Sequence, residues 1–349
     1  QYDVVDDSCL VNSVNVDYPD SVYIRKLSQL PTVIEMPYNS VVRRYIDMYV
    51  QKRRALVENL LGLSTYYMPI FEEALEREGL PLELKYLPII ESALNPSAVS
   101  RAGASGLWQF MLNTGKIYGL ESNSLVDERR DPIKATWAAA RYLKDMYAIY
   151  QDWNLVIAAY NCGPGTINKA IRRAGGKTDY WEIYNYLPKE TRGYVPAFIA
   201  ANYVMTYYCK HNICPMETNI PDATDTIQVN RNLHFEQITD VCGIGMVKSL
   251  NPQYKKNIIP GDSKPQTLRL PINYISTFID SQDTIYTHRS AELFKKRRTV
   301  SVANTRSTAR SSKGKSSSQG DVTYHRIRNG ETLSTIARKY GVTVNQIKS

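Results

Sequence analysis

Residues 87–110, LPIIESALNPSAVSRAGASGLWQF, carry the strongest structural signal in the chain. The first four residues of this stretch are apolar and lead into Glu91, and a turn rich in Gly and Ser follows before Trp108. A carboxyl group at the end of a buried segment is desolvated, which disfavours its ionised form and raises its pKa. Such a group keeps its proton near neutral pH and can donate it to a leaving group. The stretch therefore predicts a general acid at Glu91.

The sequence around this stretch predicts helices, because apolar residues recur at helical spacing on both sides of it. Pro81 suits the first position of a helix that ends at Glu91, and Pro88 within it predicts a tightened or kinked last turn. Asp131-Pro132 combines an N-cap with a proline in the first helical turn. Gly and Pro force a turn at residues 161–165 and so end another helix there.

Composition divides the chain into five segments. Residues 1–40 show weak periodicity and predict an N-terminal arm, while residues 41–215 predict a mainly α-helical domain. The order strand, helix, helix, strand over residues 222–280 predicts a small α+β unit. Residues 281–322 are rich in Ser, Arg and Lys and poor in apolar residues, so they predict a linker. A second α+β unit begins in residues 323–349, and we expect it to be truncated.

Composition also limits the class of protein. The chain has 349 residues, of which 43% are apolar and 22% charged, which is typical of globular proteins. No run of eighteen apolar residues occurs, so no membrane-spanning helix is expected. The five cysteines contain no CxxC pair, which argues against a zinc site, although Cys209 and Cys214 could form a short disulfide. The start at Gln1 suggests a trimmed form whose targeting segment has been lost.

Several ordered blocks of the chain together resemble one enzyme family. The resemblance is to the soluble-lytic-transglycosylase-like family, of the goose-lysozyme or glycoside hydrolase family 23 type. It implies a lysozyme-like helical domain with a long groove and peptidoglycan glycan strands as the substrate. It also implies cleavage of the β-1,4 bond between N-acetylmuramic acid and N-acetylglucosamine, which leaves 1,6-anhydromuramoyl ends. The matching blocks are Glu91-Ser92, Asn95-Pro96, Ser100, and residues 103–110, 159–165 and 190–196.

The resemblance implies a role for each matched position and requires no cofactor and no metal. Glu91 is implied as a single acid and base, in contrast to the paired carboxylates of most glycosidases. The block 87–110 contains no second acid, but Asp127, Glu128 or Asp131 could fold close to it. The positions implied to bind substrate in the groove are Ser100, Gln109, Tyr160, Asn161 and Tyr194.

Each of these residues also has an ordinary structural interpretation. Trp108 is expected to be a packed wall rather than a platform for a sugar ring. Gln109 either faces the groove, which we favour, or is satisfied inside the core. Tyr160 and Asn161 could simply end a helix, since Asn before Gly is common there. Tyr194 could be an ordinary core residue.

The two α+β segments resemble LysM modules, which bind glycans that contain N-acetylglucosamine. The first resembles a degenerate module through Phe235, Ile238 and residues 250–252, and its stretch between the two helices is shorter than usual. Its glycan binding is therefore left open. The second, from Tyr324, matches better through residues 330–333.

The net charge of +9 is concentrated in one segment. Residues 289–328 contain eleven Lys and Arg against two acidic residues, Glu292 and Asp321, and so carry the whole net charge. A solvated linker is the ordinary interpretation, and attraction to stem-peptide carboxylates or to an anionic envelope surface is the functional one. The segment lacks interleaved aromatic residues, so no nucleic-acid binding is expected.

Two alternatives to a lytic transglycosylase remain at this stage. One is a muramidase that hydrolyses the same bond, and the other is a cell-wall-binding protein without activity. The family resemblance implies a periplasmic or envelope location, in association with the outer membrane in some members.

Overall fold

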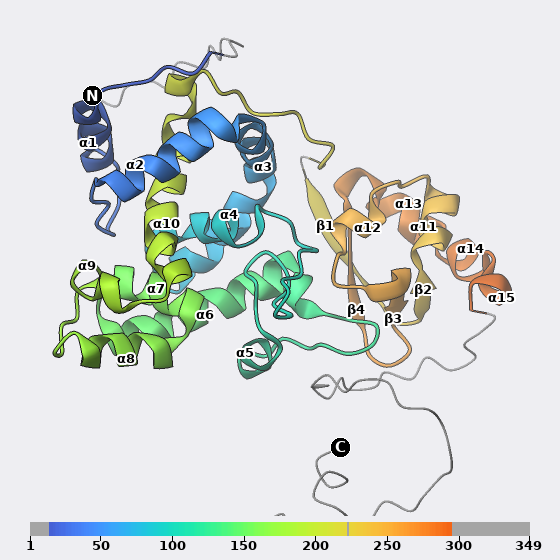
Figure 1. Ribbon diagram of the computed structural model, residues 1–349. Helices are drawn as coiled ribbons and strands as arrows, with labels where there is room; N and C mark the ends of the chain where they lie inside the picture. Colours follow the sequence, from blue (N-terminus) through green and yellow to red (C-terminus); the bar gives the residue numbers. More distant parts are fainter. Residues whose placement is uncertain (1–13, 222, 295–349) are drawn as a thin grey trace, which may run out of the picture. The chain divides into compact units, whose positions relative to one another are not determined.

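A computed structural model describes residues 14–221 and 223–294 of the chain (Figure 1). The mainly α-helical fold class, with a helical domain followed by a small α+β module, is confirmed, since the first strand begins only at Thr224. The helices before that strand are α1 (Asp20–Ser28), α2 (Ser40–Asp47), α3 (Arg54–Arg77), α4 (Leu87–Ser92), α5 (Leu112–Ile117), α6 (Pro132–Tyr150), α7 (Trp153–Cys162), α8 (Pro164–Arg173), α9 (Tyr180–Ile183) and α10 (Lys189–Tyr207).

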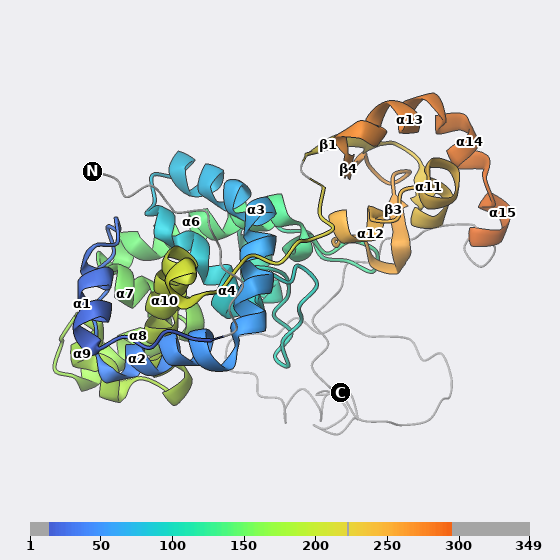
Figure 2. The same ribbon diagram turned by 90° about the horizontal axis from the view of Figure 1, so that it is seen from above.

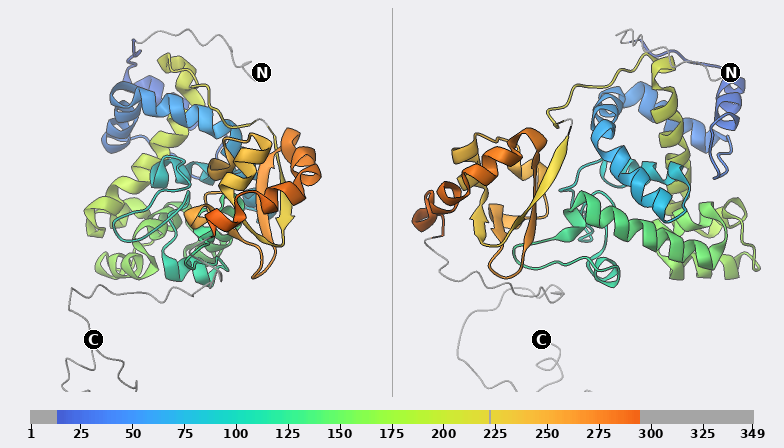
Figure 3. Two further views of the ribbon diagram at one scale, coloured as in Figure 1. Left: turned by 90° about the vertical axis from the view of Figure 1, so that its right-hand side faces the viewer. Right: turned by 180° about the vertical axis from the view of Figure 1, so that it is seen from behind.

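Helix α10 runs through the middle of the helical domain. Its side chains Val195, Phe198 and Ile199 are fully buried, and the helix packs against α2, α4 and α7. Helices α1–α3 lie near one end of α10 and helices α7–α9 near the other (Figures 1 and 3). Because α10 and the short α4 are in contact, a residue of α10 can reach the end of α4, where Glu91 lies.

Local caps explain where several helices begin and end. Asp131 Oδ1 accepts hydrogen bonds from the backbone N–H groups of Ile133 and Lys134, each at 3.0 Å, so the predicted start of α6 is confirmed. Asp152 caps α7 in the same way. The turn after α7 is shorter than expected, because Gly163 alone, with a φ of 82°, separates α7 from α8.

The helix expected from Pro81 to Glu91 is divided into two pieces. Residues Leu82–Tyr86 form a 3₁₀ turn, and α4 begins afterwards at Leu87. Pro88 therefore occupies the first turn of α4, where its missing N–H group is not needed, rather than kinking a longer helix.

The residues expected to form an arm include a packed helix. Tyr23 and Leu27 of α1 are buried in the same core as α3 and α10. The guanidinium group of Arg43 lies 4.3 Å from the centre of the Tyr23 ring and forms an ion pair with Asp20 at 2.7 Å. The spacing of Tyr23 and Leu27 places both on one helical face, which is the signal that the weak periodicity of residues 1–40 obscured.

The second part of the described chain is a small module with its own core. Strands β1 and β4 pair antiparallel from Thr224↔Pro271 to Val229↔Gln266. Two shorter strands, β2 and β3, also pair antiparallel and were not expected. Helices α11, α13 and α14 lie on the same side of the β1–β4 pair (Figures 1 and 2). Its elements are β1 (Thr224–Val229), β2 (Asn232–His234), α11 (Phe235–Cys242), α12 (Val247–Leu250), β3 (Ile258–Pro260), β4 (Gln266–Pro271), α13 (Ile275–Asp280), α14 (Gln282–Thr287) and α15 (Ser290–Leu293).

The structure places helices where the first residues of a linker were expected. Ile285 and Tyr286 of α14 are buried in the core of the module, so residues 282–293 belong to the folded unit. These apolar residues lie before the Ser- and Lys-rich part of the segment. The rest of the expected linker and the second LysM-like segment lie outside the described residues.

Candidate active site

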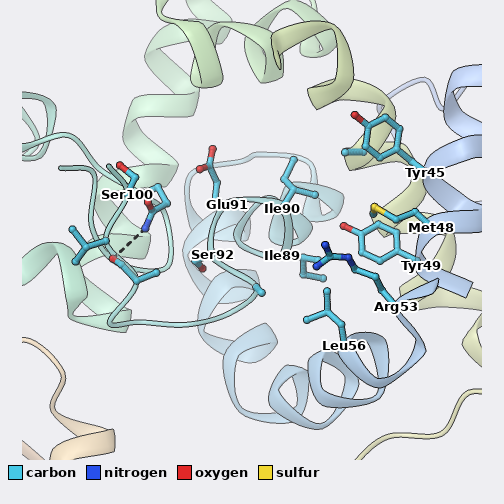
Figure 4. A pocket seen from close by; sticks show the side chains of 15 residues that line it. Tyr45, Met48, Tyr49, Arg53, Leu56, Ile89, Ile90, Glu91, Ser92 and Ser100 are labelled. Atoms are coloured by element: carbon cyan, nitrogen blue, oxygen red, sulfur yellow. Dashed lines mark hydrogen bonds between the residues drawn. The ribbon is translucent and has the colours of Figure 1, made fainter. Parts of the chain in front are cut away.

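Glu91 lies near the end of α4 and faces a cavity of about 550 Å³ (Figure 4). Helix α4 ends at Ser92, one residue after Glu91, because Ala93 and Leu94 adopt left-handed backbone conformations, with φ of 51° and 58°. The chain then continues as the loop that forms one wall of the cavity. Figure 4 shows Glu91 between Ser100 of this loop and Tyr45, which faces it from α2.

The carboxyl group of Glu91 is held by Tyr194 of α10. The Tyr194 hydroxyl donates a hydrogen bond to Glu91 Oε1, although the two residues are 103 positions apart in the sequence. Burial and the neighbouring charge of Glu91 raise the pKa of the Tyr194 phenol well above its ordinary value. The phenol therefore keeps its proton at neutral pH and acts as a donor to the acid.

Desolvation raises the pKa of Glu91 from 4.5 to about 7. The hydrogen bond from Tyr194 acts in the opposite direction, and the negative charge of Glu190 adds to the rise. The side chain of Glu91 is partly buried and keeps access to the cavity. Because its pKa is close to neutral, the group can both give a proton and take one back.

No second carboxylate among the described residues lines this cavity. The three acids that sequence left as candidates have other partners. Asp127 forms an ion pair with Arg129, and Glu128 forms one with Lys134. Asp131 caps α6. The geometry therefore provides one acid, not a pair that flanks a bond.

The loop after α4 brings Ser100 and Gln109 to the cavity wall. Gln109 has a φ of 48°, and its amide nitrogen donates hydrogen bonds to the carbonyl oxygens of Gly106 and Ala98, at 2.8 and 3.3 Å. Ser100 Oγ accepts a hydrogen bond from the backbone N–H of Ala104 at 3.0 Å. Both side chains are thus fixed by their own loop, and both residues line the cavity.

A buried ion pair between Arg129 and Asp127 anchors this loop. Arg129 donates hydrogen bonds to the carbonyl oxygens of Gly103 and Phe110, at 2.9 and 3.1 Å, and both lie in the loop. Asp127 accepts two hydrogen bonds from the same guanidinium group, at 2.8 and 2.9 Å. Gly106 is required here, because a Cβ atom would lie 1.7 Å from the carbonyl oxygen of Arg129. The Gly-rich turn thus permits close packing of the loop on its anchor.

Tyr160 and Asn161 are not among the residues that line this cavity. The Tyr160 hydroxyl donates to the carbonyl oxygen of Trp108 at 2.7 Å, and Asn161 Oδ1 accepts from the Thr191 hydroxyl at 2.9 Å. Trp108 itself is fully buried, and its indole N–H donates to Thr136 at 2.9 Å. Trp108 therefore packs as an internal wall, and Tyr160 supports it.

The opposite wall comes from residues that the sequence alone did not single out. Tyr45 at the end of α2, and Met48 and Tyr49 in the π-helical turn Met48–Lys52, line the cavity together with Arg53. Turns of this type occur often at functional sites. The spacing of Tyr45, Met48 and Tyr49 on one helical face was the signal, but it is the same signal that core packing produces.

The described residues offer no cluster of three His, Cys, Asp or Glu side chains that could hold a metal ion. The disulfide that sequence allowed between Cys209 and Cys214 is not formed in the part of the chain that the structure describes. Within residues 14–221 and 223–294, no helix has the length and apolar character needed to span a membrane.

Three segments of the chain match known family models. Residues 68–183 match the model described as the transglycosylase SLT domain. Residues 223–287 match the LysM-like domain of lytic transglycosylase MltD, and residues 325–349 match the LysM domain.

Individual proteins are also similar to parts of this chain. Membrane-bound lytic murein transglycosylase D of Escherichia coli strain K12 is 29% identical over 319 residues, which cover 90% of this chain and 66% of that protein. This chain thus spans just under two thirds of that relative. Soluble lytic murein transglycosylase of the same strain is 32% identical over 34% of this chain and 19% of that protein. The crystal structure of the 70 kDa soluble lytic transglycosylase from E. coli matches 44% of this chain and 26% of its own, with 27% identity and a TM-score of 0.36.

Proposed function

We propose that the chain is a lytic transglycosylase of the SLT-domain type that cleaves peptidoglycan glycan strands, on the basis of its matches to family models and to known lytic transglycosylases. The bond is the β-1,4 linkage between N-acetylmuramic acid and N-acetylglucosamine, and the product carries a 1,6-anhydromuramoyl end. The observation that supports this most directly is Glu91, a single cavity-lining carboxyl group whose pKa lies at about 7.

The first step uses the protonated form of Glu91. Its O–H group gives the proton to the glycosidic oxygen, and the bond from that oxygen to the anomeric carbon of the muramic acid breaks. Positive charge then develops at the anomeric carbon, where the substrate's own N-acetyl group can stabilise it. Tyr194 holds the carboxyl group in place and stabilises the carboxylate that this step creates, because its hydroxyl donates to Oε1.

The second step regenerates the acid. The carboxylate of Glu91 takes the proton of the 6-hydroxyl group, and the 6-oxygen bonds to the anomeric carbon of the same sugar. This closes the anhydro ring, consumes no water and leaves Glu91 protonated for the next cycle. A pKa near neutrality suits both steps, since one group must act first as an acid and then as a base.

The loop and the tyrosines have separate tasks in this proposal. Ser100 and Gln109 line the cavity, where they can bind the sugar or its N-acetyl group. Tyr160 and Asn161 act indirectly, through the bonds that hold Trp108 and the start of α10.

A hydrolysing muramidase is the second candidate. An inverting hydrolase needs a second carboxylate to activate water, and a retaining one needs a carboxylate nucleophile. Neither is available in the wall of the cavity among the described residues. This favours the transglycosylase reaction over hydrolysis.

The test is mass spectrometry of the products from purified sacculi. We expect muropeptides that are lighter by one water molecule than the products of hydrolysis. Products with an added water would overturn the proposal in favour of a muramidase. Equal amounts of soluble product from the wild type and from Glu91→Gln would remove Glu91 from the mechanism. If neither protein releases soluble product, only a wall-binding role remains.

The remaining partners and the location are proposed on the same basis. The LysM-like segments are proposed to bind glycan of the wall that contains N-acetylglucosamine, and the basic residues 289–328 to contact anionic groups of the envelope. The protein is accordingly proposed to act in the periplasm or cell envelope.

A further inference from the structure

A second cavity, of about 430 Å³, adjoins the one that holds Glu91. Tyr45 and Met48 line both cavities, so the two share a wall. Three basic residues line the second cavity, Arg44 from α2 and Lys189 and Arg192 from the first turn of α10. No acidic residue is among its lining residues.

The three basic side chains form no ion pair with any described residue. The contrast with the preceding residue is direct, since Arg43 pairs with three carboxylates, those of Asp17, Asp20 and Asp47. The charge of Arg44 is therefore available to a bound anion.

The position of the cations on α10 is unfavourable for the helix. A helix N-terminus carries partial positive charge, so basic residues there oppose the helix dipole. Lys189 and Arg192 nevertheless occupy the first turn of α10, whose N-cap, Pro188, supplies no side-chain acceptor. The acidic residue of this turn, Glu190, is exposed and does not line the cavity. The backbone N–H groups that precede the first intrahelical bond, from Arg192 to the carbonyl oxygen of Pro188, can add further donors. An anion bound at this point would satisfy the donors and offset the charge.

Contacts within the protein fix the position of Arg192 and the packing of the two helices that form this cavity. Arg192 is held by a hydrogen bond from its Nε to the carbonyl oxygen of Leu187, at 2.9 Å, and its guanidinium carbon lies 6.0 Å from the centre of the Tyr184 ring. Gly193 allows α2 and α10 to meet here, because a Cβ atom would lie 2.1 Å from the Tyr45 hydroxyl oxygen. Tyr45, one partner in that contact, lines both cavities.

We propose that this cavity binds a carboxylate of the peptide that muramic acid carries in the glycan strand. The inference rests on the proposed function, in which the strand lies across the adjoining cavity with its scissile bond at Glu91. Planar carboxylates are the anions that guanidinium groups bind with two hydrogen bonds, and a lysine adds a point charge. The enzyme should accordingly prefer strands that carry peptides over strands that lack them.

The experiment compares three substrates with the full chain. These are intact sacculi, sacculi stripped of peptides by an amidase that cuts at the muramic acid, and sacculi whose peptide carboxylates have been converted to amides. The readout is the ratio of kcat/KM on each peptide-bearing substrate to kcat/KM on stripped strands. We expect the highest ratio with intact sacculi, and a fall in that ratio when the salt concentration rises.

The variants are Arg44→Gln combined with Lys189→Gln, with Lys144→Gln as the matched control. Lys144 lies on α6 and pairs with Glu78, away from both cavities. The double variant should lower the intact-to-stripped ratio by roughly fivefold, the effect expected of two exposed ion pairs. The control should leave the ratio unchanged, and a thermal unfolding curve verifies that each variant is folded.

The outcomes separate this inference from the proposed function. An unchanged ratio in the double variant overturns the inference while anhydro products still support the transglycosylase. A ratio that stays high with amidated sacculi also overturns it, because the cavity would then recognise the peptide without its charge. If the wild type yields anhydro products from none of the substrates, the proposed function itself fails.

Discussion

Glu91 and Asp127 are two carboxylates withdrawn from bulk water, and the chain surrounds them in opposite ways. The side chain of Asp127 is 2% exposed, and it accepts two hydrogen bonds from Arg129, with Lys255 Nζ at 3.9 Å. Glu91 has no cation that close among the described residues and has the phenol of Tyr194 instead. A buried charge that is paired serves structure, whereas a buried acid without a cation keeps its proton and can react.

The two sites are linked through the loop that forms one wall of the cavity. Arg129 holds the loop at Gly103 and Phe110, and the loop carries Gln109 to the cavity wall. The ion pair of Asp127 and Arg129 thus fixes the loop that forms one wall of the Glu91 cavity. Changing each carboxylate in turn should therefore have different effects on activity and on stability.

The largest effect is expected for Glu91→Gln on activity. The substitution preserves shape and removes the proton, so a contribution of about 10²–10⁴-fold from general acid and base catalysis should be lost. The measurement is the initial rate of muropeptide release from sacculi. Binding of the variant to sacculi in a sedimentation assay should persist, and its loss would indicate a folding defect instead.

The second effect is on stability and concerns Asp127→Asn. Removal of this charge leaves the buried guanidinium group of Arg129 without its counter-ion, which costs about 3–5 kcal/mol of unfolding free energy. Chemical denaturation measures it. The exposed pair of Lys177 with Glu182 supplies the control, because Glu182→Gln should cost far less than Asp127→Asn. Equal costs for the two variants would contradict the role assigned to burial.

Glu91→Gln should also change the pH dependence of stability. In the folded protein the pKa of Glu91 is raised to about 7, above its ordinary value of 4.5, so the folded state binds this proton more tightly than the unfolded state. Stability therefore falls as pH rises from about 4.5 to about 7, and the cost persists above that range. The variant lacks this cost and should be more stable than the wild type at pH 8, by about 2 kcal/mol after allowance for partial solvent screening.

The wild type and Glu91→Gln should not show this difference in stability at pH 4, where Glu91 is mostly protonated in both the folded and the unfolded wild type. Glu76→Gln, on the exposed side of α3, is the control for loss of a carboxylate without burial. A gain that is constant with pH would show that the raised pKa of Glu91 is not its cause.

Much of the fold could be predicted from local sequence, because its signals act over a few residues. The cap at Asp131-Pro132 and the strand, helix, helix, strand order of the module are examples. The burial of α1 could not be predicted, since the side chains that cover Tyr23 come from α2 and α10, distant in sequence.

The residues of the candidate site could likewise be predicted from sequence only where their signal is local. The acid at Glu91 has a local signal, an apolar run that ends in a carboxylate, while Tyr194 entered only through family resemblance. No short-range pattern pairs residues that are 103 positions apart. Arg53 and Tyr49 were missed as cavity residues because helical periodicity does not separate a core face from a cavity face.

The smallest effect is expected for Tyr194→Phe, which tests how the phenol tunes the acid. Its hydrogen bond lowers the pKa of Glu91, so its removal should raise that pKa and move the alkaline limb of the pH–rate profile to higher pH. The rate at the optimum should fall by roughly tenfold, as expected for loss of a hydrogen bond to an ionised group. Tyr160→Phe is the matched control, because its hydroxyl donates to the carbonyl oxygen of Trp108 and not to Glu91. An alkaline limb that stays in place in Tyr194→Phe would show that burial alone sets the acidity of Glu91, and one that moves to lower pH would show that the hydrogen bond favours the protonated acid.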